Sequence, residues 1–206
     1  MNPYNPSDTR PADRVPRVID VELLALDLTA CARCVGSLAS IEAAVAAVRP
    51  VLEATGARVT VSKRIIGSEE EGRRFRFVSS PTIRVNGRDV APEVLETPCQ
   101  SCTDLCGCAE GTSCRVWRYR GGEYREAPAG LIMEAVLREG LATERPDRPA
   151  ADDREVPDNL RRFFRGKAAQ TPAATCCPAA ERATCCDADQ KEGCCHDSQP
   201  AACGCR

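Results

Sequence analysis

Hydrophobic and polar positions follow two periods along residues 18–140, and together they predict a mixed α/β order. Residues 18–28 join alternation to a continuous apolar run, which is typical of a buried strand. Helical spacing follows at Leu38, Ile41, Val45, Val48 and Leu52. The expected elements are a strand over 18–28, a helix over 33–55, a strand over 58–66, a short helix over 68–75, hairpins over 82–90 and 115–126, and a helix over 129–139. This order predicts an α/β domain over 18–142 with a small mixed sheet and flanking helices.

The flanks of this domain lack the same pattern. Residues 1–17 are polar and proline-rich, and we expect a disordered leader. Residues 143–170 are dominated by Pro, Ala, Asp and Arg and read as a linker with a short helix near 158–165, which carries Phe163 and Phe164. Residues 171–206 predict a disordered tail, and residues 97–114 predict a cysteine-rich loop inserted in the domain.

Charge and hydropathy limit which cellular compartment and which classes of partner fit this sequence. The 206 residues carry 28 basic and 30 acidic side chains, a formal net charge of −2, which gives no drive toward nucleic acid. The first apolar stretch contains Asp20, Glu22 and Asp27, which argues against a signal peptide and against membrane insertion. We therefore expect a cytoplasmic protein whose thiols are kept reduced.

Cysteine is the residue type in excess, with 15 in the chain. Cys31 and Cys34 stand where the first strand hands over to a helix, and Arg33 lies between them. The helix dipole and the arginine lower the pKa of a thiol at that place, so we expect Cys31 to attack from the solvent side and Cys34 to resolve. Half of a zinc site has the same spacing, so a site joining this pair to Cys99 and Cys102 and a pair of inert thiols stay open as alternatives.

Five further cysteines crowd into the loop, at Cys99, Cys102, Cys106, Cys108 and Cys114. Four thiolates suit Zn(II) or another thiophilic ion, and such a site would order an otherwise shapeless loop. Local disulfides, free thiols or an iron–sulfur cluster are the alternatives. Since the loop follows the first hairpin, it could fold back over Cys31 and Cys34 and form one shared site.

The last eight cysteines belong to a repeat of nine residues, written ATCCPAAER, ATCCDADQK, EGCCHDSQP and AACGCR. Nothing apolar in these repeats can build a core, so they predict a tether that carries dithiols at intervals. Soft thiolates select thiophilic ions, and As(III) or Hg(II) suits closely spaced pairs. A neutral low-complexity extension is the alternative. The candidate ligands are Cys176, Cys177, Cys185, Cys186, Cys194, Cys195, Cys203 and Cys205, with His196 as an added nitrogen donor.

Several motifs carry a resemblance to known families. LTACARC after a first strand and Ser80-Pro81 before a later strand resemble the thioredoxin-like superfamily. The closer resemblance is to a small thioredoxin-like domain of unknown function, through RPVLEATG, SPTIRVNGR, TPCQSC, SCRVW and EYREAPAGLIMEA over about residues 18–140. It implies a thioredoxin-like fold and a cis Pro81 lying against Cys31 and Cys34 as part of the catalytic site. The Cys-Cys tail resembles those of bacterial arsenic-handling proteins.

Our favoured hypothesis is thiol-based capture, sequestration or transfer of a thiophilic metal or metalloid, with arsenic or mercury preferred. Transporters, reductases and the thioredoxin or glutathione system are candidate partners, and Zn(II) or a similar ion is the candidate cofactor. The alternatives are a thiol–disulfide oxidoreductase that uses Cys31 and Cys34, and a zinc-stabilised interaction module.

Overall fold

The central feature of the fold is a four-stranded mixed sheet. The computed structural model describes residues 17–91, 93–142 and 155–170. Strand order is β2-β1-β3-β4, with β1 and β2 parallel and the β1–β3 and β3–β4 pairs antiparallel. The strands span Arg17–Ala25 (β1), Ala57–Ile65 (β2), Thr82–Val85 (β3) and Arg88–Asp89 (β4). This confirms the predicted α/β class and the mixed sheet.

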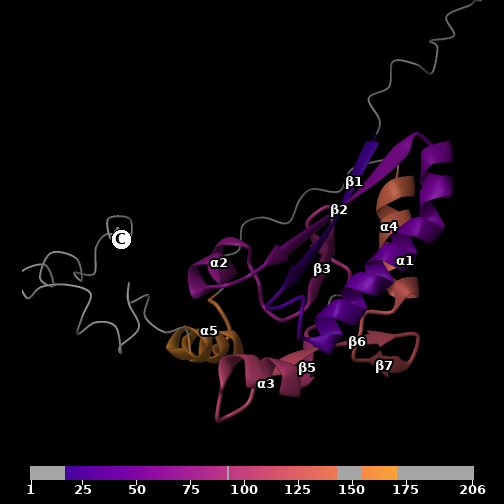
Figure 1. The fold of residues 1–206 in the computed structure, drawn as a ribbon. Helices are drawn as coiled ribbons and strands as arrows, with labels where there is room; N and C mark the ends of the chain where they lie inside the picture. Colours follow the sequence, from indigo (N-terminus) through magenta and orange to yellow (C-terminus); the bar gives the residue numbers. More distant parts are fainter. Residues whose placement is uncertain (1–16, 92, 143–154, 171–206) are drawn as a thin grey trace, which may run out of the picture.

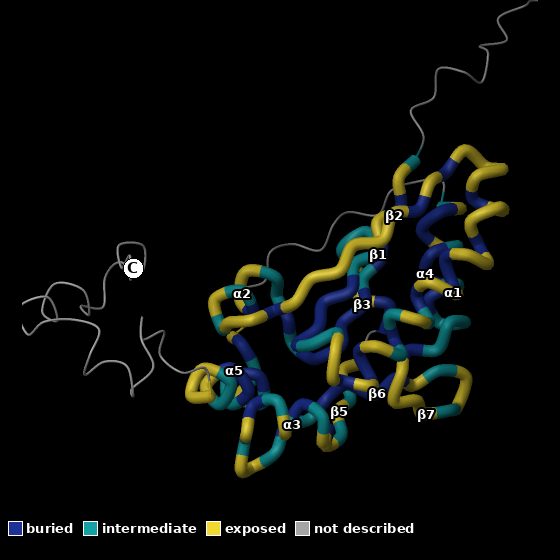
Figure 2. Tube along the Cα trace, viewed as in Figure 1, coloured by how far each residue is buried: buried dark blue, intermediate teal, exposed yellow. Residues whose placement is uncertain are grey.

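Two helices pack on one face of that sheet and lie beside each other (Figure 1). Helix α1 spans Ala32–Ala54 and α4 spans Ala129–Leu141. Pro50 lies inside α1 without ending it, and the chain leaves the helix through Gly56, whose φ is +78°. Figure 2 shows that most of β2, an edge strand of the sheet, is exposed.

Local signals in the sequence explain the shorter elements. Helix α2, Glu69–Arg74, begins at Ser68, whose side chain accepts a hydrogen bond from the Glu71 N–H. The hairpin predicted over 82–90 is confirmed by the pairing of β3 with β4, and its Asn-Gly turn has φ values of +51° at Asn86 and +81° at Gly87. The second predicted hairpin, over 115–126, is also present: Tyr119 pairs with Gly122, and its turn lies at Arg120-Gly121.

The cysteine-rich segment is folded, so the predicted loop is wrong for most of its length. It contains β5, Leu95–Pro98, and α3, Gln100–Cys106. Strand β5 pairs with β6, Ser113–Tyr119, which pairs in turn with β7, Gly122–Tyr124. Helix α3 begins after Cys99 and ends at Gly107, which adopts the left-handed conformation.

Helix α5, Asp158–Gln170, covers this segment and extends five residues beyond the predicted helix. Its Leu160, Phe163 and Phe164 are buried, and α5 lies against α3 (Figure 1). The segment expected to be a linker thus contributes three large side chains to the folded unit.

Buried side chains form two clusters. The first core is built of hydrocarbon from β1, α1, β3 and α4. The second core combines Leu24, Leu26, Ile66 and Phe77 with the α5 side chains and six buried cysteines. Successive residues Leu23 and Leu24 belong to different cores because side chains alternate across a strand.

Among the described residues, α1 alone is long and apolar enough to cross a membrane by length and composition. Eight of its residues are buried, and Ile41, Val45 and Leu52 pack in the first core. A core helix of a folded domain passes the same test.

Candidate metal centre

Four cysteine sulfurs meet in the second core. Those of Cys31, Cys99, Cys102 and Cys114 all lie within 4.8 Å of one another, and all four residues are buried. The Sγ of Cys102 lies 3.6 Å from that of Cys31 and 3.2 Å from that of Cys114. A tetrahedral tetrathiolate ion with Zn–S bonds of about 2.3 Å places its sulfurs ~3.8 Å apart. The four thiols therefore have the number and spacing needed to hold one metal ion.

Three segments distant in sequence supply these sulfurs. Cys31 caps α1, Cys99 caps α3 with Cys102 in the first turn, and Cys114 lies on β6 opposite Thr97 of β5. The Cys99 N–H donates to the Thr112 carbonyl (2.8 Å), which closes α3 onto the start of β6. The cysteine-rich segment thus folds back over the start of α1 and brings three of its sulfurs to Cys31, an arrangement that the sequence analysis gave as possible.

Asp27 fixes the turn that presents Cys31. Its Oδ1 accepts hydrogen bonds from the backbone N–H groups of Thr29 (2.8 Å), Ala30 (2.5 Å) and Cys31 (3.2 Å). Partial burial works to raise the pKa of Asp27, but these backbone donors outweigh it and lower that pKa. The carboxylate therefore orders the approach to α1.

Arg33 ties α1 to both strands that flank the cluster. Arg33 is buried, and its guanidinium donates to the carbonyls of Thr97 (3.2 Å), Pro98 (2.7 Å) and Cys114 (2.9 Å). The sequence indicated only a nearby cation at this position. The sequence could not show that three carbonyl groups, 64 to 81 residues further along the chain, would converge on this guanidinium.

Hydrogen bonds among the four thiols lower the pKa of two of them and contribute to a raised pKa of the other two. The bond with Cys102 is the main cause that lowers the pKa of Cys31, and it lowers that of Cys99 to about 6. The bond with Cys102 is also the main cause of the raised pKa of Cys114. For Cys102 the bond with Cys114 lowers the pKa, but the bonds with Cys31 and Cys99 and burial outweigh it. A bound cation would favour the thiolate form at all four positions.

Cys34 lies next to the cluster but outside it. Its Sγ is 3.4 Å from Ser80 Oγ, which also accepts a hydrogen bond from the Leu26 N–H (3.0 Å). Hydrogen bonding with Cys31 and burial raise the pKa of the Cys34 thiol. The Ser80–Pro81 peptide bond is cis, as the resemblance implied.

Two predictions about this region are wrong. Cys31 has no solvent exposure, so it does not lie on the solvent side of its turn. The four-thiol set takes Cys114 in place of Cys34, because β6 rather than the second residue of the pair faces the other sulfurs.

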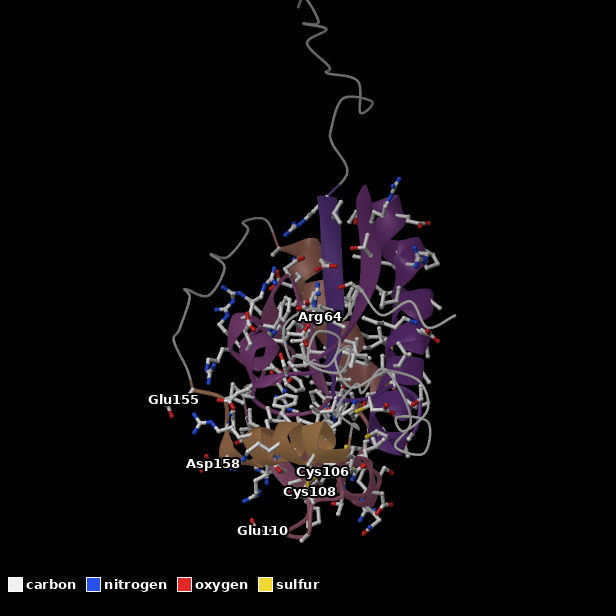
Figure 3. The ribbon with its side chains drawn as sticks, turned by 60° about the vertical axis from the view of Figure 1, so that its left-hand side comes forward. Arg64, Cys106, Cys108, Glu110, Glu155 and Asp158 are labelled. Atoms are coloured by element: carbon white, nitrogen blue, oxygen red, sulfur yellow. A yellow bond between two sulfur atoms is a disulfide. The ribbon has the colours of Figure 1, made fainter. Side chains whose placement is uncertain are left out.

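The five clustered cysteines of the segment divide into two groups. Cys99, Cys102 and Cys114 join Cys31, whereas Cys106 and Cys108 form a disulfide at the other end of α3 (Figure 3). Gly107 makes the tight turn between the last two, with φ of +58°. The eight candidate ligands from Cys176 to Cys205, with His196, lie outside the described residues.

Comparison with known proteins identifies the domain that contains this cluster. Residues 19–136 match the profile of a family described as a domain of unknown function, DUF2703. The chain belongs to this family. All four clustered cysteines lie inside the matched region, while α5 and residues 171–206 lie beyond it. Comparison with curated proteins gave no match, and neither did comparison with solved structures.

Proposed function

We propose that this protein captures a thiophilic metal or metalloid ion and holds it at the centre formed by Cys31, Cys99, Cys102 and Cys114. The convergence of four buried sulfurs within 4.8 Å carries the proposal. Four thiolates around one ion favour a d10 divalent cation that accepts tetrahedral sulfur ligation. Zn(II) and Hg(II) fit this description, whereas As(III) would leave one of the four thiols unused.

Arg33 supports the proposal through charge. Four thiolates and a divalent ion carry a net charge of −2, and Arg33 brings a buried positive charge to the end of β5, next to Cys99, and to Cys114 on β6. The three acceptors of its hydrogen bonds are neutral carbonyl groups. An anionic metal centre would supply the negative charge that these three carbonyl groups do not offer to the guanidinium.

The Cys-Cys repeats extend the proposal to sequestration. Multiple dithiols on one chain raise the local thiol concentration, so an ion that leaves the centre would be recaptured at residues 176–205. As(III), which takes three sulfurs, suits these repeats better than the centre. We place the protein in the cytoplasm, where reduced thiols persist, with a transporter, a metalloid reductase or the glutathione system as donor or acceptor.

We also propose that the fold is thioredoxin-like. In support, the Cys31–Cys34 pair begins α1 directly after the β1 turn, β1 and β2 are parallel, and a cis proline precedes β3.

The test is to titrate the reduced full-length protein with Zn(II), Hg(II) and As(III) and to count bound ions by native mass spectrometry. X-ray absorption should show four sulfurs around Zn(II) at about 2.3 Å. Serine at Cys102 or Cys114 should abolish this coordination. Serine at Cys34 is the matched control, because that buried thiol touches the cluster without belonging to it. Coordination by fewer than three sulfurs, or equal loss from the Cys34 variant, would contradict the proposal.

The tail needs a separate measurement. Replacing its eight cysteines with serine in the full-length chain should leave one tightly bound Zn(II) and reduce the number of bound As(III) ions. Unchanged As(III) stoichiometry would reject sequestration by the repeats while leaving the four-thiol centre untouched.

A second candidate function is thiol–disulfide exchange at Cys31 and Cys34. The lowered pKa of Cys31 at the start of α1 and the cis Pro81 favour it. The burial of Cys31 opposes it. Reduction of glutathione disulfide by the metal-free protein, abolished in Cys31→Ser, would support this function; activity that survives the substitution would exclude it.

A further inference from the structure

A buried metal centre needs a path by which an ion enters it. All four cysteines of the centre are buried. Among the cysteines in the described ranges 17–91, 93–142 and 155–170, Cys108 alone is partly exposed, and every other one is buried. A thiophilic ion that approaches through sulfur ligands therefore meets Cys108 first.

Helix α3 leads from Cys108 to the centre. Cys106 ends α3 two residues before Cys108 (Figure 3), and Cys102 lies four residues before Cys106, on the same face of the helix. Exposure falls along this line, from partial at Cys108 to 1% at Cys106 and 0% at Cys102. The segment thus carries a series of sulfurs from the surface to the centre.

The spacing of these sulfurs suits an exchange of ligands. Residues four apart on a helix have Cβ atoms about 5–6 Å apart, and ligand pairs at this spacing hold one ion in helical zinc sites. Cys102 and Cys106 can therefore share an ion. At the surface end, Cys106 and Cys108 are close enough to be bonded to each other, so their thiolates can also chelate one ion. Because Cys106 belongs to both pairs, an ion can pass between them without losing all its sulfur ligands.

In the structure Cys106 and Cys108 form a disulfide, which closes this entry. A bond across so short a loop restrains the unfolded chain very little, because the entropic gain grows with loop length. Oxygen acceptors for both S–H groups are in place: Thr112 Oγ1 lies 3.3 Å from Cys106 Sγ, and the Arg162 carbonyl oxygen lies 3.6 Å from Cys108 Sγ. The surroundings therefore suit the dithiol as well as the disulfide.

We propose that reduced Cys106 and Cys108 form the entry site through which a thiophilic ion reaches the four-thiol centre. The proposal rests on the function proposed above. A cellular thiol of the glutathione class opens the site: two such thiols become one disulfide, and Cys106 and Cys108 each gain one electron and one proton.

The transfer of the ion involves no change in oxidation state. The dithiol binds the ion and releases two protons to solvent. Cys102 then replaces Cys108 as a ligand, and the other three cysteines of the centre replace Cys106. Each incoming thiol loses its proton to solvent, and the two departing thiolates take up protons again.

The experiment measures how fast Zn(II) enters and leaves the centre. The parent protein is the full-length chain with its eight tail cysteines replaced by serine and the remaining thiols reduced by a phosphine. Stopped-flow transfer from a chromophoric chelator gives the entry rate, and transfer to an excess of a stronger chelator gives the exit rate. Cys106→Ser and Cys108→Ser should each slow entry by about tenfold or more, because the dithiol raises the local concentration of the ion.

Exit should slow by the same factor as entry. The pair lies on the path of the ion but outside the four-sulfur set, so the Kd for Zn(II) and the four-sulfur coordination should not change. A purely structural role of the pair would instead speed release and weaken the Kd. Cys34→Ser is the matched control, because it removes a buried thiol on the α1 side of the centre and should leave both rates unchanged.

The outcomes distinguish the entry site from the centre. Four-sulfur binding with unchanged rates in Cys108→Ser, whose position is partly exposed, would overturn the entry site and leave the centre standing. Faster release from either variant, or equal slowing in Cys34→Ser, would also overturn the entry site. Failure of the parent chain to bind Zn(II) through sulfur would contradict the proposed function and the entry site together.

Discussion

The two cores of this molecule are stabilised by different chemistry. The first, between the sheet and helices α1 and α4, is made of hydrocarbon such as Leu23, Ile41 and Val45. The second, under α3 and α5, mixes aromatic side chains with cysteines whose sulfurs converge. Burial of apolar area stabilises the first whether or not a metal ion is present. The second gathers thiols that repel one another once ionised, so we expect its stability to depend on a bound cation.

Removal of metal should produce the largest difference in stability between the two cores. With free metal about 1,000-fold above Kd, a bound ion contributes about 4 kcal/mol to folding, and a chelator removes that contribution. Hydrogen exchange measured by mass spectrometry should then show faster exchange over residues 99–114 and 158–170. Residues 41–52 of α1 should keep their protection, since they pack in the first core. Uniform loss along the chain would mean that the cores unfold as one unit.

Leu23 and Leu24 offer a matched pair for the next test. Both are fully buried, and each faces a different core. Alanine at either position should reduce the free energy of unfolding by about 3 kcal/mol, through lost burial and a residual cavity. For Leu23→Ala the loss should be the same with and without metal, whereas Leu24→Ala should also weaken metal retention. Urea unfolding of both variants in the two metal states measures this coupling, and equal coupling would contradict the division into two cores.

The sequence predicted the first core better than the second. The apolar spacing from Leu38 to Leu52 and the Asn86-Gly87 turn act locally, so α1 and the β3–β4 hairpin could be recognised. Helix α3 was missed, although Gly107 marks its end, because its short sequence QSCTDLC gives too little helical periodicity. Cysteine spacing suggested a shared site but could not show that Cys114 replaces Cys34, since that choice depends on how β6 pairs with β5.

Arg33 should raise the affinity for metal, because its hydrogen bonds hold β5 and β6 in place beside the four thiols. Arg33→Gln removes a fork that donates to Thr97, Pro98 and Cys114, at a cost of about 2 kcal/mol. Competition with a chromophoric chelator should therefore show a Kd for Zn(II) weakened by about tenfold or more. Arg33→Lys keeps the charge without the fork and should recover only part of the affinity.

The control for this change lies on the same helix. Arg49 pairs with Glu53 across 4.0 Å, and both side chains are exposed. Arg49→Gln should leave the affinity for Zn(II) unchanged, because an exposed ion pair contributes little. If both variants weaken binding alike, Arg33 acts through general charge rather than through its three carbonyl contacts.

Gly140→Ala should have the smallest effect and should be confined to the first core. An added Cβ would lie 2.4 Å from Leu52 Cδ2 and 2.9 Å from Ile19 Cδ1, where α4 crosses α1 and β1. Alanine favours the helix by up to about 1 kcal/mol, but overpacking costs 1–3 kcal/mol, roughly, so we expect a net loss of about 1 kcal/mol. Urea unfolding measures this loss, and Zn(II) affinity should not change. A stabilised variant would show that Leu52 and Ile19 can move aside, and hence that the hydrocarbon core is less closely packed than the contact distances indicate.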